Sequence, residues 1–213
     1  MSFAVLPRAI MSLFRMRPSE PAPAEKAAVV PGALPEVAYL TIETLSGPDY
    51  QFDSEGLFSD EVRGMLHENY AIRPLASDDF HKGYVETLSQ LTTVGNLTEE
   101  LFQERFARLK RFNEIYYCIA IEDLTSNKIV GLGTIMIEDK FIHEAGRVGH
   151  IEDIVVNDCA RGKNLGKIII EALKFIGKEK GAYKTLLACS QHNIGFYAKC
   201  GMAQKEVVMS VYY

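Results

Sequence analysis

Cysteine and histidine are scarce in this chain, and neither is grouped in a way that would hold a metal ion. The four cysteines, Cys118, Cys159, Cys189 and Cys200, are widely spaced with no C-x-x-C pair, and the five histidines show no metal-ligand spacing. Zinc sites and disulfide scaffolds need tighter grouping. We therefore expect no metal, and four buried, reduced thiols of the kind found in cytosolic proteins.

Long apolar runs and an excess of basic residues are also missing. No stretch of about 18 apolar residues occurs, so we expect no membrane span. Asp and Glu (28) outnumber Lys and Arg (23), giving a net charge of −5. A nucleic-acid-binding protein should carry a basic excess, so we expect no nucleic-acid partner, and any anionic ligand must bind a local basic patch. With 47% hydrophobic residues and no internal repeat, the chain should form one globular domain plus an appendage.

The first 47 residues differ in composition from the rest. Proline and alanine recur there and apolar periodicity is weak, which predicts a variable, disordered or loosely packed extension, followed by a folded domain over residues 48–213. Three arginines, Arg8, Arg15 and Arg17, occur before Pro18 without any acidic residue, a faint likeness to a mitochondrial transit peptide. We favour a plain N-terminal tail on a cytoplasmic protein over mitochondrial targeting.

Apolar periodicity and turn residues predict a regular order of elements from Tyr70 onward. We expect strands at about 71–75, 116–123, 129–138, 145–156, 184–189 and 205–213. We expect helices from an N-cap at Ser77-Asp78-Asp79 to Leu91, from Thr98 to Phe112, from Gly166 to Lys180, and from an Asn193 cap to Cys200-Gly201. The order β-α-α-β-β-β-α-β-α-β indicates a single layered α/β domain.

The segment from Ile151 to Lys167 is the most informative part of the chain. An apolar strand runs into a turn with glycines and then into a helix, so unpaired backbone N–H groups and a positive dipole end are available for a phosphate or pyrophosphate. Arg161, Lys163 and Lys167 add cationic side chains there. The turn is neither a P-loop, because Asn164 stands where Ser or Thr is needed, nor a G-x-G-x-x-G fingerprint. From these residues alone, an ordinary βα connection with solvated lysines remains open.

The turn resembles the acetyl-CoA pyrophosphate loop of the GNAT acetyltransferase superfamily, whose pattern is Arg/Gln-x-x-Gly-x-Gly/Ala. Arg161 and Gly166 match the ends of that pattern, and Asn164 occupies the usual central glycine position. The glucosamine 6-phosphate N-acetyltransferases are the subfamily that the chain resembles most. The matching blocks follow their order over residues 50–213: Leu91-Thr92-Thr93-Val94-Gly95, Lys140-Phe141-Ile142-His143-Glu144, Gly149-His150-Ile151-Glu152-Asp153-Ile154, 161–167, Ala182-Tyr183-Lys184 and 193–201.

This resemblance implies a fold, a reaction and a cofactor site. The fold would be the GNAT acyl-CoA N-acyltransferase fold, a mixed, mostly antiparallel sheet with splayed central strands flanked by helices. The reaction would transfer acetyl from acetyl-CoA to glucosamine 6-phosphate, on the route to UDP-N-acetylglucosamine. Residues implied to bind acetyl-CoA are Ile154, Val155, Val156, Arg161, Gly162, Lys163, Asn164, Leu165, Gly166, Lys167, Asn193, Phe196, Tyr197 and Lys199.

Acetyl transfer to an amine requires a neutral amine, oxyanion stabilisation and a proton for the departing thiolate. The resemblance implies that Glu152 and Asp153 contact the sugar and its amine. It also implies that Tyr197, whose phenol is a suitable general acid, protonates the departing thiolate. Glu152 and Asp153 are adjacent, so in a regular strand their side chains point to opposite faces and at most one faces the amine. Without the resemblance, both acids would be interpreted as solvent-exposed residues at a strand end with no catalytic role.

The implied sugar-phosphate contacts are Thr92, Lys140, Phe141, Ile142, His143, Glu152, Asp153, Tyr183 and Lys184. Two positions depart from the family: Ala188 replaces an acid before the Tyr197 helix, and Tyr212 stands near the usual C-terminal Arg. A tyrosine cannot replace the bidentate phosphate contact of Arg. Two alternatives therefore stay open, a GNAT enzyme that acetylates another small amine, and a weakly active acyl-CoA-binding partner subunit.

The last segment, Glu206 to Tyr213, reads as an apolar strand that reaches the end of the chain. A free edge of this kind, without proline or a protecting charge, promotes aggregation. Pairing with a second subunit removes the edge, and the resemblance implies a dimer whose C-terminal strands exchange. We therefore expect a homodimer.

Overall fold

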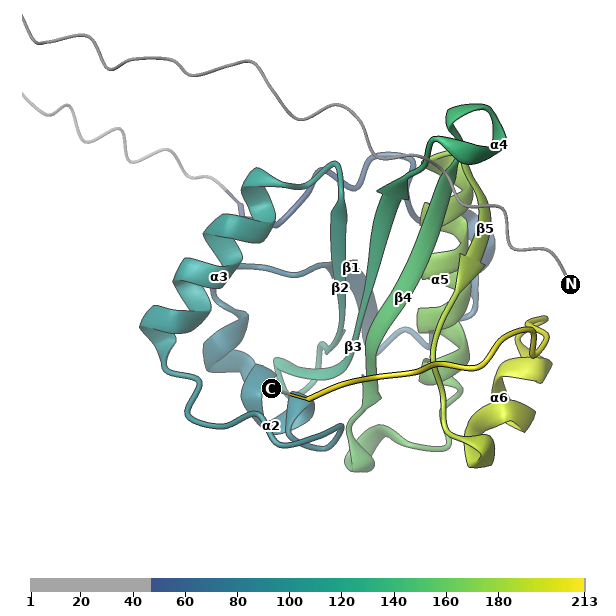
Figure 1. Cartoon of the computed structure of the whole chain (residues 1–213). Coiled ribbons are helices and arrows are strands. Elements are labelled where there is room, and N and C mark those ends of the chain that lie inside the picture. The colour runs from purple at the N-terminus through teal and green to yellow at the C-terminus, as the bar shows by residue number, and fades with distance from the viewer. Residues whose placement is uncertain (1–46, 213) are drawn as a thin grey trace, which may run out of the picture. The chain divides into compact units, whose positions relative to one another are not determined.

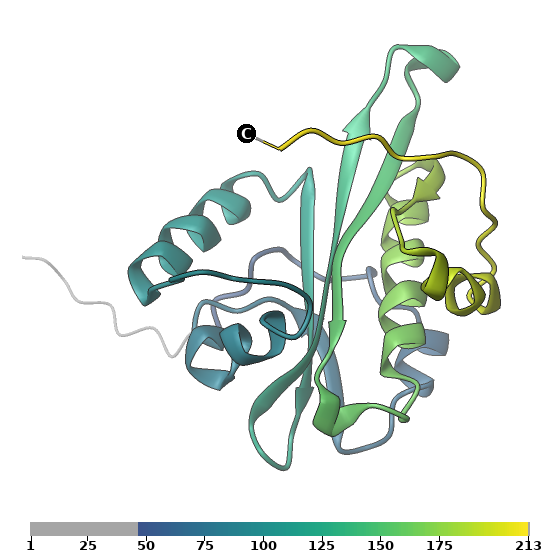
Figure 2. The same cartoon turned by 60° about the horizontal axis from the view of Figure 1, so that its bottom comes forward.

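The computed structural model describes residues 47–212, so the N-terminal extension expected over residues 1–47 lies, apart from Gly47, outside the described residues. Five strands form one sheet in the order β1-β2-β3-β4-β5. The views in Figures 1 and 2 show helix α5 on one face of this sheet and helices α2 and α3 on the other. The expected layered α/β domain with flanking helices is confirmed.

The sheet is antiparallel except at one edge. Its strands are β1 (Tyr70–Pro74), β2 (Tyr116–Asp123), β3 (Lys128–Asp139), β4 (Arg147–Val156) and β5 (Ala182–Leu186). β1, β2, β3 and β4 pair antiparallel in succession, whereas β4 and β5 pair in parallel. The sequence prediction placed these five strands within a few residues, except that β5 starts two residues earlier than expected and ends at Leu186.

Alternating side chains of the central strands build a core on each face. Ile119 and Ile121 of β2 are buried toward α5, while Cys118 and Ala120 are buried on the other face, against α3. Helix α5 (Leu165–Glu179) buries the whole apolar face expected from its periodicity, formed by Leu165, Ile168, Ile169, Ala172, Leu173 and Ile176. Each fully buried Ile or Leu stabilises the fold by roughly 1.5–3 kcal/mol.

The remaining helices are shorter, and most are held by side-chain caps or aromatic packing. They are α1 (Asp60–Gly64), the 3₁₀ helix η1 (Asp79–Lys82), α2 (Tyr84–Leu88), α3 (Glu99–Arg111), α4 (Ile142–Ala145), η2 (Asp158–Ala160), η3 (Gln191–Asn193) and α6 (Ile194–Lys199). Thr98 caps α3 as expected, because its Oγ1 accepts a hydrogen bond from the Leu101 N–H at 3.3 Å. Phe102 and Phe106 are the buried residues of α3.

The continuous helix expected from Ser77 to Leu91 is wrong. The segment forms η1 and then α2, separated by Gly83 in the left-handed conformation at φ 85°. Asp79, expected within the N-cap and first turn of that helix, is fully buried: its two oxygens accept hydrogen bonds from the Arg73 guanidinium at 2.6 and 2.9 Å. Satisfying this buried charge pulls the chain inward and prevents a regular first turn.

The strand expected over residues 205–213 is also wrong for the single chain. Residues 203–212 have neither helix nor strand, and the side chains of Val207, Val208, Met209, Val211 and Tyr212 are exposed. A strand requires a neighbouring backbone to satisfy its N–H and C=O groups, and this segment pairs with none within residues 47–212. The Asn193 side chain does not cap α6, although the helix ends as expected at Cys200-Gly201, with Gly201 at φ 75°.

Candidate active site

Strand β4 loses its partner β5 before the middle of its length, because β5 ends there and the chain turns away. Their parallel pairing begins at Arg147 and Ala182 and ends at His150 and Leu186, and beyond this point β4 continues alone to Val156. Figure 1 shows the two strands diverging toward α6. The expected splay between central strands is confirmed. It leaves the backbone of β4 after His150 without a strand partner on that side, where it can bind an extended ligand.

A groove of about 630 Å³ lies at the wide end of this splay, within the size range of small-molecule sites. It is lined by Gln90, Leu91, Ile154, Val155, Val156, Ala160, Arg161, Gly162, Asn164, Leu165, Gly166, Lys167, Asn193, Phe196 and Tyr197. The structure thus brings together most of the residues expected to bind acetyl-CoA. Two of that set, Lys163 and Lys199, do not line the groove.

The turn before α5 has the backbone geometry of an anion cradle. Gly162 and Asn164 are both left-handed, at φ 79° and 65°. Asparagine tolerates this conformation better than most non-glycine residues, which explains how Asn164 can occupy the usual glycine position of the loop. The first intrahelical bond of α5 runs from the Ile168 N–H to the Asn164 carbonyl, so the N–H groups of residues 165–167 have no intrahelical partner and are available to a ligand.

The cationic side chains of the turn differ in direction. Arg161 is exposed at the groove and forms an ion pair with Asp158 at 2.5 Å, and Lys167 also lines the groove. Lys163, in contrast, donates a hydrogen bond to the Tyr70 hydroxyl and lies 5.0 Å from the centre of that ring, and this bond raises the pKa of Lys163. In this structure the Lys163 side chain therefore lies against Tyr70, not in the groove, and its expected contact with the pyrophosphate stays a prediction. Its direction depends on Tyr70, 93 residues away in the sequence.

Helix α6 forms the wall opposite the turn through two aromatic residues. Phe196 and Tyr197 meet edge to face with ring centres 5.1 Å apart, and both line the groove. A Cβ at Gly166 would lie 3.2 Å from Phe196 Cζ, so glycine there allows α6 to approach α5. Burial raises the pKa of Tyr197, with the nearby Cys189 and Cys200 adding to the shift, and keeps its phenol protonated near neutral pH.

Strand β4 carries a bulge at Asp153, just past the point where β5 leaves. Leu132 of β3 pairs with Val155 and Thr134 pairs with Glu152, so Gly133 faces two residues, Asp153 and Ile154. Asp153 is left-handed at φ 53°. A Cβ at Gly133 would approach Ile169 Cγ2 to 2.6 Å, so glycine is needed there for α5 to pack across the bulge.

The bulge overturns the expectation that Glu152 and Asp153 point to opposite faces. Glu152 is opposite Thr134 in the register, so their side chains share a face of the sheet. Asp153 lines the same cavity as Thr134, and both acids are exposed. An inserted residue breaks the two-residue period of a strand, and here it places both carboxylates on the face covered by α2 and α3.

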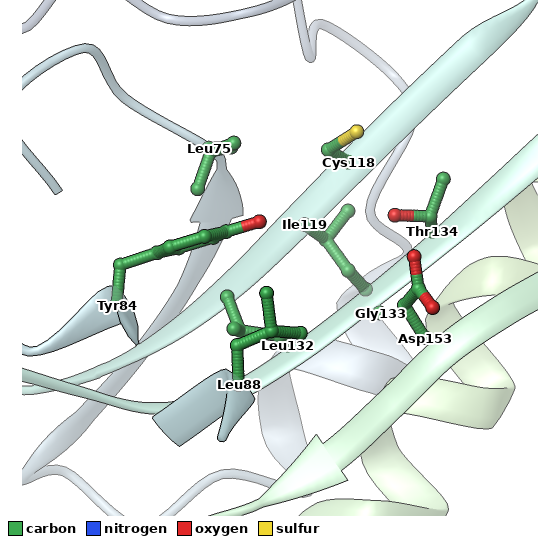
Figure 3. A pocket seen from close by; sticks show the side chains of 9 residues that line it. All are labelled: Leu75, Tyr84, Leu88, Cys118, Ile119, Leu132, Gly133, Thr134 and Asp153. Atoms are coloured by element: carbon green, nitrogen blue, oxygen red, sulfur yellow. The ribbon is translucent and has the colours of Figure 1, made fainter. Parts of the chain in front are cut away.

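Beside Asp153 lies a small cavity of about 20 Å³ (Figure 3). Four polar groups from four elements line it: the Tyr84 hydroxyl, the Cys118 thiol, the Thr134 hydroxyl and the Asp153 carboxylate, which points toward Thr134. This volume is sufficient for about one water molecule. Burial raises the pKa of Cys118 to about 11 and also raises the pKa of Tyr84, so both groups stay neutral beside the carboxylate.

The acetyltransferase (GNAT) family model matches residues 72–202, more than half of the chain, and this range contains the splay, the turn and the groove. The chain belongs to the GNAT acetyltransferase family. The members of this family use acetyl-CoA as acetyl donor, and the groove with its helix N-terminus fits that donor. Among residues 47–212, no group of three or more His, Cys, Asp or Glu side chains could hold a metal ion.

Two relatives of this GNAT chain are similar to it over nearly their whole length. Glucosamine 6-phosphate N-acetyltransferase 1 from Dictyostelium discoideum is 48% identical over 151 residues, which span 71% of this chain and 96% of the relative. The corresponding enzyme from Arabidopsis thaliana is 44% identical over 148 residues, with 70% and 99% of the two chains covered. Its crystal structure superposes with a TM-score of 0.67, covering 68% of this chain and 99% of that one.

The residues expected to bind the sugar phosphate are distributed along β4 of this acetyltransferase. Lys140, Phe141 and the first residues of α4, Ile142 and His143, precede β4; Phe141 is fully exposed, and His143 contacts Tyr183 with ring centres 4.2 Å apart and planes tilted by 41°. Lys184 is exposed on β5, opposite Val148. Lys140 and His150 both bind the Glu138 carboxylate, at 2.5 and 2.8 Å, and these two contacts lower the pKa of Glu138.

Thr92 lies near the other end of β4, because Gln90, two residues before it, bonds to Asp158 just after the strand. Lys140–His143 and Thr92 are thus about the length of β4 apart, ten residues at roughly 3.3 Å each. One chain does not bring them together. The acids Glu152 and Asp153 lie between the two groups.

Several site residues could not be found from the sequence. Gln90, Leu91 and Ala160 line the groove, and Tyr84, Cys118 and Thr134 line the cavity beside Asp153. The two glycines of Gly131-Leu132-Gly133 in a strand were the one available signal, since glycine in a strand often marks a bulge. The expectation of four buried thiols holds for Cys118 and Cys200 and is wrong for Cys159 and Cys189, which are exposed.

Across the described part of the chain, no helix has the length and apolarity needed to span a bilayer.

Proposed function

We propose that this enzyme transfers the acetyl group of acetyl-CoA to the amine of D-glucosamine 6-phosphate, giving N-acetyl-D-glucosamine 6-phosphate and CoA for UDP-N-acetylglucosamine biosynthesis. The observation that carries the proposal is one groove that joins the anion-binding turn, residues 154–156 on the unpaired edge of β4 and Tyr197, with Asp153 next in the strand. The choice of sugar phosphate is supported by the names of the two relatives that match this chain almost end to end.

Binding of acetyl-CoA is assigned to the groove. The N–H groups of residues 165–167 and the guanidinium of Arg161 bind the pyrophosphate, and the pantetheine arm lies along β4 where β5 has separated. Backbone N–H groups of β4 around Asp153 and Ile154 then face the thioester carbonyl. Donors of this kind stabilise the oxyanion that develops in the transition state.

The reaction proceeds by direct attack of the amine on the thioester in a ternary complex. A carbon–nitrogen bond forms, the carbon–sulfur bond breaks, and no covalent enzyme intermediate is needed. Asp153 or Glu152 accepts the proton that the amine loses, because both carboxylates lie on one face beside the separated strands. Tyr197, whose phenol stays protonated, donates a proton to the CoA thiolate.

We further propose that two copies of the chain assemble the sugar site. The phosphate-binding block Lys140–His143 and Thr92 are too far apart in one chain to bind one small sugar together. The exposed apolar segment Val207–Tyr212 gives each chain a surface that a second copy can cover. Light scattering at micromolar concentration should give the mass of a dimer, and a monomer mass for soluble full-length protein would refute the assembly.

Thiol release from acetyl-CoA tests the activity directly. Glucosamine 6-phosphate should be acetylated with a kcat/KM far above that for glucosamine, the control that lacks only the phosphate. A preference for glucosamine or a polyamine would instead favour an enzyme adapted to another amine, prompted by Ala188 and Tyr212. Tight acetyl-CoA binding without turnover on any amine would favour a weakly active partner subunit.

We place the reaction in the cytoplasm. All four cysteines are free, and two of them, Cys159 and Cys189, are exposed, which suits a reducing compartment. The alternative, mitochondrial targeting by the three N-terminal arginines, concerns residues outside the described range. Imaging the full-length chain and a chain starting at residue 48 would separate the two: equal cytoplasmic distribution supports our assignment, and mitochondrial signal from the full-length chain alone contradicts it.

A further inference from the structure

Helix α2 and the residues that follow it form hydrogen bonds to the start of the turn before α5 (residues 157–164), here called the pyrophosphate turn. Gln90 Oε1 accepts a hydrogen bond from the Asp158 N–H at 2.7 Å. Three residues earlier, within α2, Thr87 Oγ1 accepts a hydrogen bond from Asn157 Nδ2 at 3.0 Å. Two neighbouring residues of the turn are therefore held from the same segment, Asn157 by Thr87 of α2 and Asp158 by Gln90, two residues after the helix ends.

The Thr87 hydroxyl is buried and makes hydrogen bonds both as a donor and as an acceptor. Thr87 has no exposed surface, and its hydroxyl donates to the Ile129 carbonyl of β3 at 2.7 Å while it accepts from Asn157. Asn157 is itself fixed, because its N–H donates to the Val130 carbonyl and its Oδ1 accepts from the Cys159 N–H. A chain of hydrogen bonds thus runs from β3 through Thr87 to the turn, and it leaves little freedom for independent movement of α2.

The same segment forms a wall of the acetyl-CoA groove and leads into the loop assigned to the sugar. Gln90 and Leu91 line the groove, and the Leu91 side chain is 42% exposed there, so a bound ligand would cover it. Thr92 follows directly. From Thr92 to Leu97, no amide donates a hydrogen bond to another group within residues 47–212, so this loop has few contacts to hold it in place.

Both ends of α2 also lie at the cavity beside the Asp153 carboxylate. Tyr84 and Leu88 line the cavity that contains Asp153. Helix α2 and the three residues after it therefore contact the pyrophosphate turn, line the groove and the Asp153 cavity, and lead into the Thr92 loop. A ligand that holds the turn and covers Leu91 also restricts the loop that begins one residue later.

We propose that Thr87 and Gln90 are positioning residues that transmit occupancy of the acetyl-CoA groove to the Thr92 loop, so that CoA binding orders the loop before the acceptor binds. The acceptor side of this inference rests on the proposed sugar-phosphate function; the ordering of the loop by CoA does not. Because coupling between two sites is reciprocal, the acceptor should in turn tighten the binding of CoA.

Hydrogen–deuterium exchange of residues 89–97, with and without saturating CoA, tests the ordering without any acceptor. In the wild type, CoA should slow exchange in this segment. Thr87→Val, which keeps the shape but removes the hydroxyl, and Gln90→Met, which removes the acceptor at an exposed position, should lose that protection although CoA is bound. Thr87→Ser keeps the hydroxyl and should restore it. No protection in the wild type, or full protection in both deficient variants, would overturn the proposal.

Calorimetry with CoA and glucosamine 6-phosphate, which cannot react together, measures the coupling. The sugar phosphate should increase the affinity for CoA about fivefold or more in the wild type and in Thr87→Ser, and by less than twofold in Thr87→Val and Gln90→Met, fivefold being the lower end of typical couplings. Equal gains in all four proteins would refute the coupling. Loop protection without turnover on the sugar phosphate would leave this inference supported and the proposed function wrong.

Discussion

Replacing Asp153 by asparagine separates the chemical role of the carboxylate from its place in the fold. Asp153 is left-handed at φ 53°, a conformation that Asn adopts as readily as Asp, so the bulge should keep its geometry. We expect the free energy of unfolding to change by less than about 0.5 kcal/mol, as for most exposed substitutions without a special role. The amide cannot accept a proton from the amine, so kcat should fall by about 10²–10⁴, equivalent to roughly 3–5.5 kcal/mol in the barrier.

Asp153→Ala provides a matched control for the backbone. Alanine also lacks the carboxylate, but the left-handed conformation costs it roughly 1–2 kcal/mol. Both variants should therefore lose activity to a similar extent, and only the alanine variant should lose stability, by about 1 kcal/mol. Thiol release gives the rates and urea unfolding gives the stabilities.

Glu152→Gln identifies which of the two acids is the base. Both carboxylates lie on the same face, so the variant that loses more kcat marks the group nearer to the amine. If Asp153→Asn and Glu152→Gln each retained more than half of the wild-type kcat, neither carboxylate would take the proton. The mechanism proposed for this site would then be wrong.

Three further predictions follow from the turn and from the buried ionisable groups. Arg161→Ala should raise the KM for acetyl-CoA about tenfold or more with a smaller change in kcat, because a lost charge-assisted contact costs roughly 1.5–3 kcal/mol. Lys163→Ala should raise this KM much less, because the Lys163 ammonium lies against Tyr70, and equal effects of the two variants would contradict the assignment. Arg73→Met should lower the free energy of unfolding by about 3–5 kcal/mol in a urea titration, because two buried carboxylates lose their partner, and a loss below 1 kcal/mol would show that they are solvated. Burial raises the pKa of the Cys118 thiol from 9.0 to about 11, so its contribution to stability is full below pH 9 and is lost as the pH rises to 11. The melting temperature of Cys118→Val should therefore fall less steeply with alkaline pH than that of the wild type, and an equal fall in both proteins would refute this.

The fold was predictable because the strongest sequence patterns belong to the elements that build the core. The apolar runs of β2 and β3 and the one-sided face of α5 depend on local periodicity, and all three are buried as expected. The turn at residues 157–164 was recognisable for a similar reason. Its glycine and basic residues are contiguous in the sequence and make an anion site largely from local backbone.

The features that the sequence did not predict depend on contacts between distant residues. The bulge at Asp153 is fixed by the register with Gly133 and by Ile169 of α5 packing across it, and a period-two pattern cannot anticipate an inserted residue. The first turn of the expected helix at Ser77 is lost to the buried pair of Arg73 and Asp79. Thr87 on the short helix α2 and Gln90 just after it are polar residues, and the sequence suggests surface positions for both until their partners Asn157 and Asp158 are known.

Acetyl transfer from labelled donor to sugar phosphate tests the central claim most directly. The enzyme is incubated with acetyl-CoA carrying ¹³C in the acetyl carbonyl and with glucosamine 6-phosphate, and the products are followed by NMR while free thiol is counted. Our account predicts one labelled amide on the sugar nitrogen for each thiol released. Label that accumulates only as free acetate, or that stays in acetyl-CoA at millimolar sugar phosphate, would contradict it.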